Sequence, residues 1–380
     1  MITTTDVLVV GAGPTGLTLA AALTARGVRT TVVDALPEGA NTSRAAAVTA
    51  RTLEVLEEID VSERMVKAGI QARNFSIRDH SRVLIPLDFS VLPTAYPYTL
   101  MISQADTEQL LLDRLEELGG DVVRPRKVTG VHQDGERAVA TFDDGDQISA
   151  QYVVGADGMH SAVRQGAGIG FAGQAYPEAF VLADVRLTGK VPVSEILLFY
   201  ARTGLVVVAP LPGDRYRIVA PVSEAPAEPG RETVQQILDR RAFGPGELIV
   251  GDVIWSSRFR IHHRVADTYR SGRLLLAGDA AHVHSPAGGQ GMNLGIQDAV
   301  ALADALARVA GGESDQLLDA YSNARRPIAQ QVVRLTDRLT RLATLPTALR
   351  PARNTAMSLA SHVPAVQRTL TWQLSGLVNR

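Results

Sequence analysis

Cysteine is absent from the 380-residue sequence. Disulfide bonds, iron–sulfur clusters, thiolate zinc sites and cysteine nucleophiles are therefore excluded. The absence is compatible with a reducing compartment, and we expect the protein in the cytoplasm. No apolar run reaches the length of a membrane-spanning helix, and the polar residues 1–5 lead directly into a short strand, so we expect no secretory signal peptide.

The sequence also has no excess of positive or negative charge. Charged residues make up 21% of the chain, and the net charge is only −2 at pH 7. Such a chain has no electrostatic field for binding DNA, RNA or an anionic membrane. The hydrophobic fraction of 46% suffices for a sizeable core, and a length of 380 residues favours two lobes. We expect a small-molecule partner, and a protein that is a monomer or a homodimer.

The N-terminal segment has the pattern of a βαβ unit. Apolar and β-branched residues predict a strand over 6–10 and a second buried strand over 30–33. Helical spacing of apolar residues predicts a helix over 14–26, between the two strands. The sequence thus begins with the unit that opens dinucleotide-binding folds.

A G-x-G-x-x-G motif lies at the turn from this first strand into the helix, as Gly11, Gly13 and Gly16. Gly11 permits the tight turn, Gly13 lets the backbone approach a pyrophosphate, and Gly16 lets helix and strand pack closely. The helix N-terminus at Pro14 and Thr15 directs free N–H groups and a positive dipole end toward the phosphates. The motif therefore predicts a dinucleotide site.

Asp34 ends the second strand about twenty residues after the motif and is followed by Ala35. A carboxylate at this place accepts a hydrogen bond from a ribose 2′-OH and disfavours a 2′-phosphate, so NADPH is not expected in this particular site. FAD and NAD share the same ADP half, and this motif alone leaves both open. The alternative is a glycine turn that serves packing only.

A second glycine-rich segment favours FAD. Gly278 and Asp279 follow a strand of three leucines, where Asp279 can accept from a hydroxyl of a ribityl chain. Residues 286–291 form a glycine-rich crossing that can lie against a flat ring. Met292 and Asn293 open a long helix, whose N-terminal N–H groups can stabilise negative charge on a reduced flavin.

This segment also allows two other interpretations. The loop and its helix could be purely structural, with no ligand. A metal site formed by Asp279, His282 and His284 is the other alternative, but it leaves the glycine-rich loop unexplained. We therefore predict that no metal is bound.

The third motif, "YVVGADGMHSAVR", reads as a strand followed by a helical turn. Asp157 and Gly158 end the strand, and Ser161 and Arg164 follow on the turn. Asp157 either contributes to the cofactor site or only caps the turn.

These motifs, in this order, resemble the para-hydroxybenzoate hydroxylase family of FAD-dependent single-component monooxygenases, and within it the aromatic polyketide hydroxylases. The resemblance spans nearly the whole chain. It is carried by "GAGPTG", "SRAAAVTARTLEVL", "ISQADTEQLLLDRL", "GADGMHSAVR", "WSSRFRIHHRVADTYRSGRLLLAGDAAHVHSPAGGQGMNLGIQDA" and "LSGLVNR". It implies an α/β fold with a Rossmann-type FAD-binding lobe, an inserted antiparallel-sheet substrate lobe and C-terminal helices.

The division expected from this resemblance interleaves the two lobes along the chain. It assigns FAD binding to 1–75, 101–170 and 263–330, the substrate lobe to 76–100 and 171–262, and a helical segment to 331–380. Polyketide hydroxylases usually continue into a thioredoxin-like domain about where this chain stops. We expect either a short member or a truncated one, which leaves the oligomeric contacts open.

The resemblance also implies roles at the cofactor. Arg44 and Gln104 would contact the FAD phosphates and ribityl region, Asp279 the ribityl chain, and Asp157 the FAD while it helps to position NAD(P)H. The predicted cofactor-binding residues are Gly11, Gly13, Pro14, Thr15, Gly16, Asp34, Ala35, Arg44, Gln104, Asp157, Gly278, Asp279, Pro286, Gly289, Gly291, Met292 and Asn293.

Two residues are predicted to be catalytic. Arg51 falls where polyketide hydroxylases place an arginine near the isoalloxazine and the substrate, and Pro286 would line the flavin face near the reacting oxygen. We place Arg44 and Arg51 on one helix within "SRAAAVTARTLEVLEEI". The alternative for Arg51 is a surface arginine paired with Glu54 or Glu58.

The implied reaction is that of an NAD(P)H-using FAD-dependent aromatic hydroxylase. NAD(P)H reduces the FAD, and a flavin hydroperoxide then hydroxylates an aromatic, polyketide-like molecule, as in antibiotic biosynthesis. Baeyer–Villiger insertion, epoxidation, another oxidation or a non-catalytic flavoprotein subunit remain alternatives. No general base is identified, and the candidates for assisting a phenol are Arg51, Tyr200, Tyr216, His80 and His262.

Overall fold

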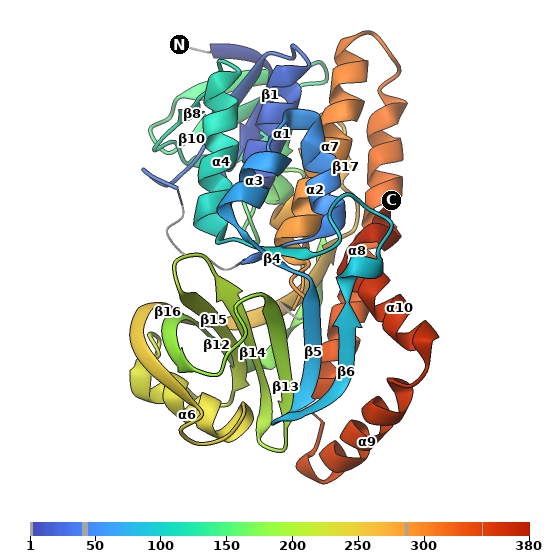
Figure 1. Cartoon of the computed structure of the whole chain (residues 1–380). Coiled ribbons are helices and arrows are strands. Elements are labelled where there is room, and N and C mark those ends of the chain that lie inside the picture. The colour runs from blue at the N-terminus through green and yellow to red at the C-terminus, as the bar shows by residue number, and fades with distance from the viewer. Residues whose placement is uncertain (1–2, 40–44, 286–287, 344) are drawn as a thin grey trace.

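A mixed eight-stranded sheet forms the centre of the first lobe in the computed structural model, which describes residues 3–39, 45–285, 288–343 and 345–380 (Figure 1). Its order is β17-β18-β11-β1-β2-β8, with β10 and β9 continuing from β11. The pairs β1–β2 and β1–β11 are parallel, as in dinucleotide-binding folds. The bounds are β1 Thr3–Val10, β2 Thr30–Val33, β8 Val122–Val123, β9 Val128–Gln133, β10 Ala138–Phe142, β11 Gln147–Gly155, β17 Arg270–Ser271 and β18 Leu274–Leu276.

The first helix of this lobe is buried on every side. Leu17, Leu19 and Leu23 are at most 1% exposed, because α1 packs on β1 and β2 and also contacts α4 and α7. A helix that is apolar all round is typical of such a central position. The helices of this lobe are α1 Pro14–Ala25, α2 Ala50–Leu56, α3 Ser62–Ala68, α4 Gln104–Glu117, α5 Ala162–Gly166 and α7 Gly291–Ala310.

A second eight-stranded sheet, ordered β19-β16-β12-β15-β14-β13-β5-β6, forms the other lobe (Figure 1). Its described pairs are antiparallel except β13–β5, which is parallel. The helix α6 (Arg231–Arg241) packs on β13, β14 and β16. The strands are β5 Asn74–Asp79, β6 Arg82–Asp88, β12 Phe171–Gly189, β13 Glu195–Ala201, β14 Gly204–Leu211, β15 Arg215–Val222, β16 Leu248–Ala266 and β19 His282–Val283.

A three-stranded sheet of β3 (Ala47–Val48), β7 (Thr99–Met101) and β4 (Ile70–Ala72) lies between the lobes. It corrects one prediction, because residues 47–48 are extended where the sequence predicted one helix carrying both Arg44 and Arg51. Pairing with β7 outweighs the helical propensity of the alanines, and α2 begins only at Ala50.

The C-terminal helices cover the second lobe and return the chain to the first. These helices are α8 (Gln316–Ala343), α9 (Arg350–Ala360) and α10 (Pro364–Leu374), and both α9 and α10 contact β6. The side chain of Leu377 is 1% exposed and packs with Ala50. None of the helices in the described part of the chain is both long and apolar enough to cross a membrane.

A buried ionic cluster ties α7 to α8 and to the segment after β18. The Asp298 carboxylate accepts from Arg325 Nε at 2.6 Å and lies 2.6 Å from His282 Nε2, and all three side chains are at most 8% exposed. Burial alone would raise the pKa of Asp298, but Arg325 and His282 outweigh it, so this pKa lies below its usual value.

Replacing Asp298 with Ala leaves the Arg325 charge buried without its carboxylate. We expect the free energy of unfolding to fall by about 3–5 kcal/mol. Asp304→Ala is the matched control, because Asp304 lies on the same helix and its 3.8 Å pair with Arg308 is exposed; it should cost less than about 1 kcal/mol. Urea unfolding of the three proteins measures both changes, and equal stabilities would refute the role of the cluster.

Candidate active site

The three glycine motifs of the sequence meet at one place. A Cβ added to Gly11 would lie 2.4 Å from the Ala156 carbonyl oxygen, so the third motif lies directly against the first. A Cβ added to Gly278 would lie 2.5 Å from Thr15 Oγ1, so the second motif lies directly against the first helix. Gly11 and Gly278 both have positive φ, of 100° and 61°, which favours glycine at each.

Gly13 marks the side of the first motif that the rest of the protein leaves open. A Cβ added there would meet no described protein atom within 4 Å, whereas one added to Gly16 would lie 1.9 Å from the Gly11 carbonyl oxygen. Gly13 is also the N-cap of α1, and because glycine has no side chain, no side-chain oxygen caps the first N–H groups of the helix. This open space before free N–H groups fits a pyrophosphate, as FAD requires.

Asp34 is held at the end of β2 by backbone N–H groups. Its carboxylate accepts from Ala12 N at 2.6 Å and from Leu36 N at 2.8 Å. Both bonds fix the carboxylate beside the glycine turn, with Ala35 between Asp34 and Leu36. The arrangement is suitable for a carboxylate that accepts from a ribose hydroxyl.

Arg124 is a basic side chain at this turn that the sequence interpretation missed. Its Nη2 donates to the Ala12 carbonyl oxygen at 3.3 Å, and its Nε is buried without a hydrogen-bond partner in the described residues. No local pattern identifies it, because Arg124 lies 112 residues away from Ala12 in the sequence.

The second motif places a helix N-terminus beside the glycine-rich crossing. Gly291 and Met292 lie in the first turn of α7, and Gly289 has a φ of 63°. The Asn293 side chain is fully used by protein: it accepts from Thr49 N at 2.8 Å and donates to the Gly289 carbonyl oxygen at 2.7 Å. Asn293 therefore connects the crossing to the residues just before α2.

Asp157 accepts hydrogen bonds from the first N–H groups of α5, whose N-cap residue is Ser161, and uses only one carboxylate oxygen for them. Oδ2 accepts from Ala162 N at 2.7 Å, while Oδ1 is buried without a hydrogen-bond partner in the described residues. Burial raises the pKa of this carboxyl. The capping alternative is thus observed, and the unpaired oxygen is the feature that a polar ligand could satisfy.

A buried ion pair from the second lobe reaches the loop that precedes β3. Arg217 on β15 donates from Nε and Nη2 to Asp184 on β12, both at 2.7 Å, and its Nη1 donates to the Ala45 carbonyl oxygen at 2.8 Å. Both charged side chains are at most 5% exposed. Gln104 also holds this loop, since its Oε1 accepts from Ala45 N at 3.1 Å.

Arg51 pairs with Glu54 in this structure, as the alternative interpretation predicted. The distance from Nη1 to the Glu54 carboxylate is 3.1 Å, and the Arg51 side chain is 29% exposed. Glu54 is also bound by Arg380 and by Thr94, whose hydroxyl lies 2.7 Å away. Arg51 thus lies in the first turn of α2, within a polar group that includes Arg380, the last residue of the chain.

The other candidate residues differ in their surroundings. Tyr216 is buried in the core of the second lobe, which raises its pKa, and His262 Nδ1 is buried without a hydrogen-bond partner in the described residues. Arg44 and Pro286 lie outside the described residues. Tyr200 is 1% exposed, and burial raises its pKa to about 12, so it belongs to the core. His80 Nδ1 lies 2.6 Å from the Ala242 carbonyl oxygen, just after α6. Among the described residues, no group of three or more His, Asp or Glu side chains is placed to hold a metal ion.

His284 lies within the second motif, between Asp279 and the start of α7. Its Nδ1 is 2.8 Å from the Ser285 carbonyl oxygen, and its Nε2 is buried without a hydrogen-bond partner in the described residues. Burial lowers the pKa of His284 to about 4. The imidazole is therefore neutral at pH 7 and adds no positive charge at the glycine-rich crossing.

Comparison with known proteins decides the family. The model of the FAD binding domain family matches residues 4–336. The chain belongs to this FAD binding domain family. Its predicted family and fold class are confirmed, and it is a flavin-dependent aromatic monooxygenase, as predicted.

Three relatives illustrate the similarity. A 12-dehydrotetracycline 5-monooxygenase/anhydrotetracycline 6-monooxygenase of Streptomyces rimosus is 38% identical over 98% of this chain and 76% of its own length. Pentachlorophenol 4-monooxygenase of Sphingobium chlorophenolicum is 36% identical over 86% of this chain and 63% of its own length. The crystal structure of p-nitrophenol 4-monooxygenase from Pseudomonas putida superposes with a TM-score of 0.85, at 26% identity and 99% coverage of both chains.

Gly13 and Gly16 allow folding and cofactor binding to be separated within one motif. Gly13→Ala should leave the free energy of unfolding of the FAD-free protein nearly unchanged but weaken FAD binding tenfold or more, because the new methyl group enters the open space. Gly16→Ala should destabilise the fold itself by about 3 kcal/mol.

FAD titration of the apoprotein and urea unfolding measure the two effects. Gly130→Ala is the control, because a Cβ there also meets no described atom within 4 Å. Unchanged FAD affinity in Gly13→Ala would place the pyrophosphate elsewhere.

The low pKa of His284 predicts a pH dependence. Between the folded value of about 4 and the ordinary value of 6.5, only the unfolded chain takes up the proton, so stability falls as the pH falls through this range. His284→Gln should lose that part of the dependence, up to about 1.4 kcal/mol per pH unit. Urea unfolding of the FAD-free proteins at pH 7.5 and 5.0 tests this, and an identical pH dependence in both proteins would contradict it.

Proposed function

We propose that this chain is a single-component hydroxylase in which NAD(P)H is the reductant and an aromatic polyketide or a related phenol is the substrate. The observation that carries the proposal is the contact of the second and third motifs with the first at Thr15 and Gly11, beside the open space at Gly13. The relatives' names support the substrate class, since they include tetracycline-type and phenolic monooxygenases. We further propose a cytoplasmic enzyme, either monomeric or homodimeric.

FAD would be held by the lobe assigned to 1–75, 101–170 and 263–330, and the substrate by the lobe of 76–100 and 171–262 with the segment 331–380. Backbone N–H groups at the start of α1 would face the pyrophosphate, and Asp34 would accept from a ribose hydroxyl. Asp279 and Gln104 would bind toward the ribityl chain. Bound FAD supplies the activation of O2 and the transfer of one oxygen atom.

The residues around the crossing would orient the flavin and exclude water. The N-terminal N–H groups of α7 would stabilise negative charge at the pyrimidine end of the ring. Arg44 would serve the phosphates, Pro286 would line the flavin face, and Arg51 would hold an oxygen of the substrate by a charge-assisted hydrogen bond.

The direct test is oxygen incorporation. The FAD-loaded protein is incubated with NADPH or NADH, 18O2 and a panel of anthracycline, tetracycline and simple phenol substrates, and products are read by mass. The proposal expects one 18O atom in a hydroxylated aromatic product. A ring-expanded ester would indicate Baeyer–Villiger insertion, and FAD that NAD(P)H does not reduce, with or without substrate, would contradict the enzyme proposed.

Arg51→Ala tests the assignment of the reaction centre. FAD should remain bound, but product formed per NAD(P)H should fall and hydrogen peroxide should rise, with a loss of about 2–4 kcal/mol in transition-state stabilisation. Glu54→Gln is the matched control, because it breaks the observed Arg51–Glu54 pair and keeps the guanidinium. If Arg51→Ala forms as much product per NAD(P)H as the wild type, or if both variants lose the same fraction of product, Arg51 is only a structural partner of Glu54.

A further inference from the structure

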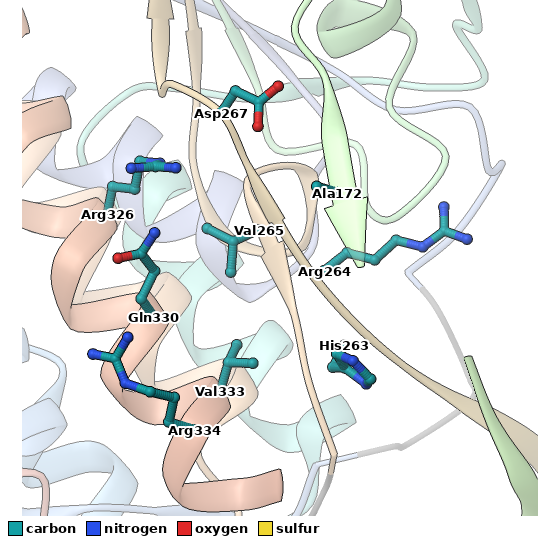
Figure 2. A pocket seen from close by; sticks show the side chains of 9 residues that line it. All are labelled: Ala172, His263, Arg264, Val265, Asp267, Arg326, Gln330, Val333 and Arg334. Carbon is teal, nitrogen blue, oxygen red and sulfur yellow. The ribbon is translucent and has the colours of Figure 1, made fainter. Parts of the chain in front are cut away.

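A basic cavity lies between strand β16 and helix α8, apart from the motifs described above (Figure 2). Its volume is about 310 Å³. From α8 it is lined by Arg326, Gln330, Val333 and Arg334, and from the strands and the turn after β16 by Ala172, His263, Arg264, Val265 and Asp267. Three arginines against one carboxylate make the cavity cationic, although the whole chain has a net charge of −2.

On the helix side of the cavity, side chains that can donate hydrogen bonds form a row along α8. Arg326, Gln330 and Arg334 are spaced four residues apart and therefore lie on one face of α8, over about 12 Å of its length. Figure 2 shows these three side chains along the helix, whereas the Arg264 side chain extends from the strand away from them. An elongated row of this kind suits a ligand with more than one anionic group.

Several N–H groups that line the cavity donate no hydrogen bond to the described residues. Arg326 Nε donates to the Ala266 carbonyl oxygen at 3.0 Å, which anchors the helix to the end of β16. Arg264 Nε is buried without a hydrogen-bond partner in the described residues. Arg334 is exposed and forms no ion pair or hydrogen bond with any described residue, and Asp267 forms no ion pair with the arginines.

The cavity is also close to the glycine-rich crossing. Five residues after Arg334, about 8 Å along the helix, a Leu339 methyl group lies 3.9 Å from where a Cβ on Gly288 would be. Thr340 Oγ1 donates to Ser285 Oγ at 2.8 Å. On the strand side, Arg264 and Val265 pair with β19, which leads into the same crossing. A ligand bound by phosphates in the cavity could extend toward the flavin.

We propose that this cavity binds the phosphate groups of the nicotinamide dinucleotide during reduction of the flavin. The inference rests on the proposed use of NAD(P)H. It adds a docking site that is separate from the ADP site at Gly13, with Arg334 and Arg326 as phosphate donors. Guanidinium groups form paired, charge-assisted hydrogen bonds with phosphate, so arginine suits the task better than lysine.

The test uses the FAD-loaded protein and anaerobic stopped-flow reduction by NADPH and by NADH. Arg334→Ala should raise the apparent Kd of the reductant about tenfold, equivalent to about 1.4 kcal/mol, and leave the reduction rate at saturation and the FAD affinity unchanged. Arg338→Ala is the matched control, because Arg338 is exposed on the same helix but does not line the cavity.

The same Kd in wild type and Arg334→Ala would overturn the docking site and leave the proposed function intact. A wild-type protein that neither nucleotide reduces would overturn the proposed function instead. Calorimetry with 2′,5′-ADP and with inorganic phosphate then tests the cavity independently. Binding of 2′,5′-ADP that Arg334→Ala weakens supports the nucleotide assignment, and phosphate binding as tight as that of 2′,5′-ADP would reduce the cavity to a general anion site.

Discussion

The close approach of three backbone segments around Thr15 is the constraint on which the rest of this structure depends. The turn at Gly11 can lie against Ala156, and the start of α1 against Gly278 and Gly295, only because none of these glycines carries a Cβ. A single methyl group at Gly16 or Gly295 would stand within 2.3 Å of a neighbouring atom. The contact between Thr15 and Gly295 brings together residues that are 280 positions apart in the sequence.

Buried hydrogen bonds and an ion pair then hold the segments that surround this contact. Asn293 connects the crossing to the residues before α2, and the Arg217–Asp184 pair connects the second lobe to the loop at Ala45. Such buried pairs contribute little net stability, but they leave few alternative positions for the groups that they bind. The two lobes are thereby placed relative to one another at the loop where the FAD phosphates are proposed to bind.

The sequence correctly predicts those structural elements that depend only on residues close together in the chain. Ser103 before the segment "QADTEQLLLDRLEELGG" predicts a capped helix from these neighbouring residues alone. The structure confirms it, because α4 begins at Gln104 and the Ser103 hydroxyl accepts from Asp106 N. The dipeptide Asp144-Gly145 likewise predicts a hairpin turn, and β10 and β11 pair antiparallel on either side of it. The motifs themselves are local patterns whose glycines have a specific steric purpose.

Features that depend on distant partners could not be predicted in this way. The helix expected from Ser43 fails at Ala47 and Val48, because these residues pair with β7, about 50 residues later in the chain. Arg217 and Asp184 are 33 residues apart on neighbouring strands, and only the register of the sheet brings them together. Arg51 pairs with Glu54 because the two are three residues apart on one helix, which the sequence did allow as an alternative.

Hydrogen exchange of the apoprotein before and after FAD addition tests the convergence of the three motifs most directly. A common FAD site predicts slower exchange in 11–17, 156–164 and 278–295 at the same FAD concentration, with the second sheet far from the contact unchanged. Protection confined to one of the three segments, or protection of the segments at clearly different FAD concentrations, would contradict a single site built from all three.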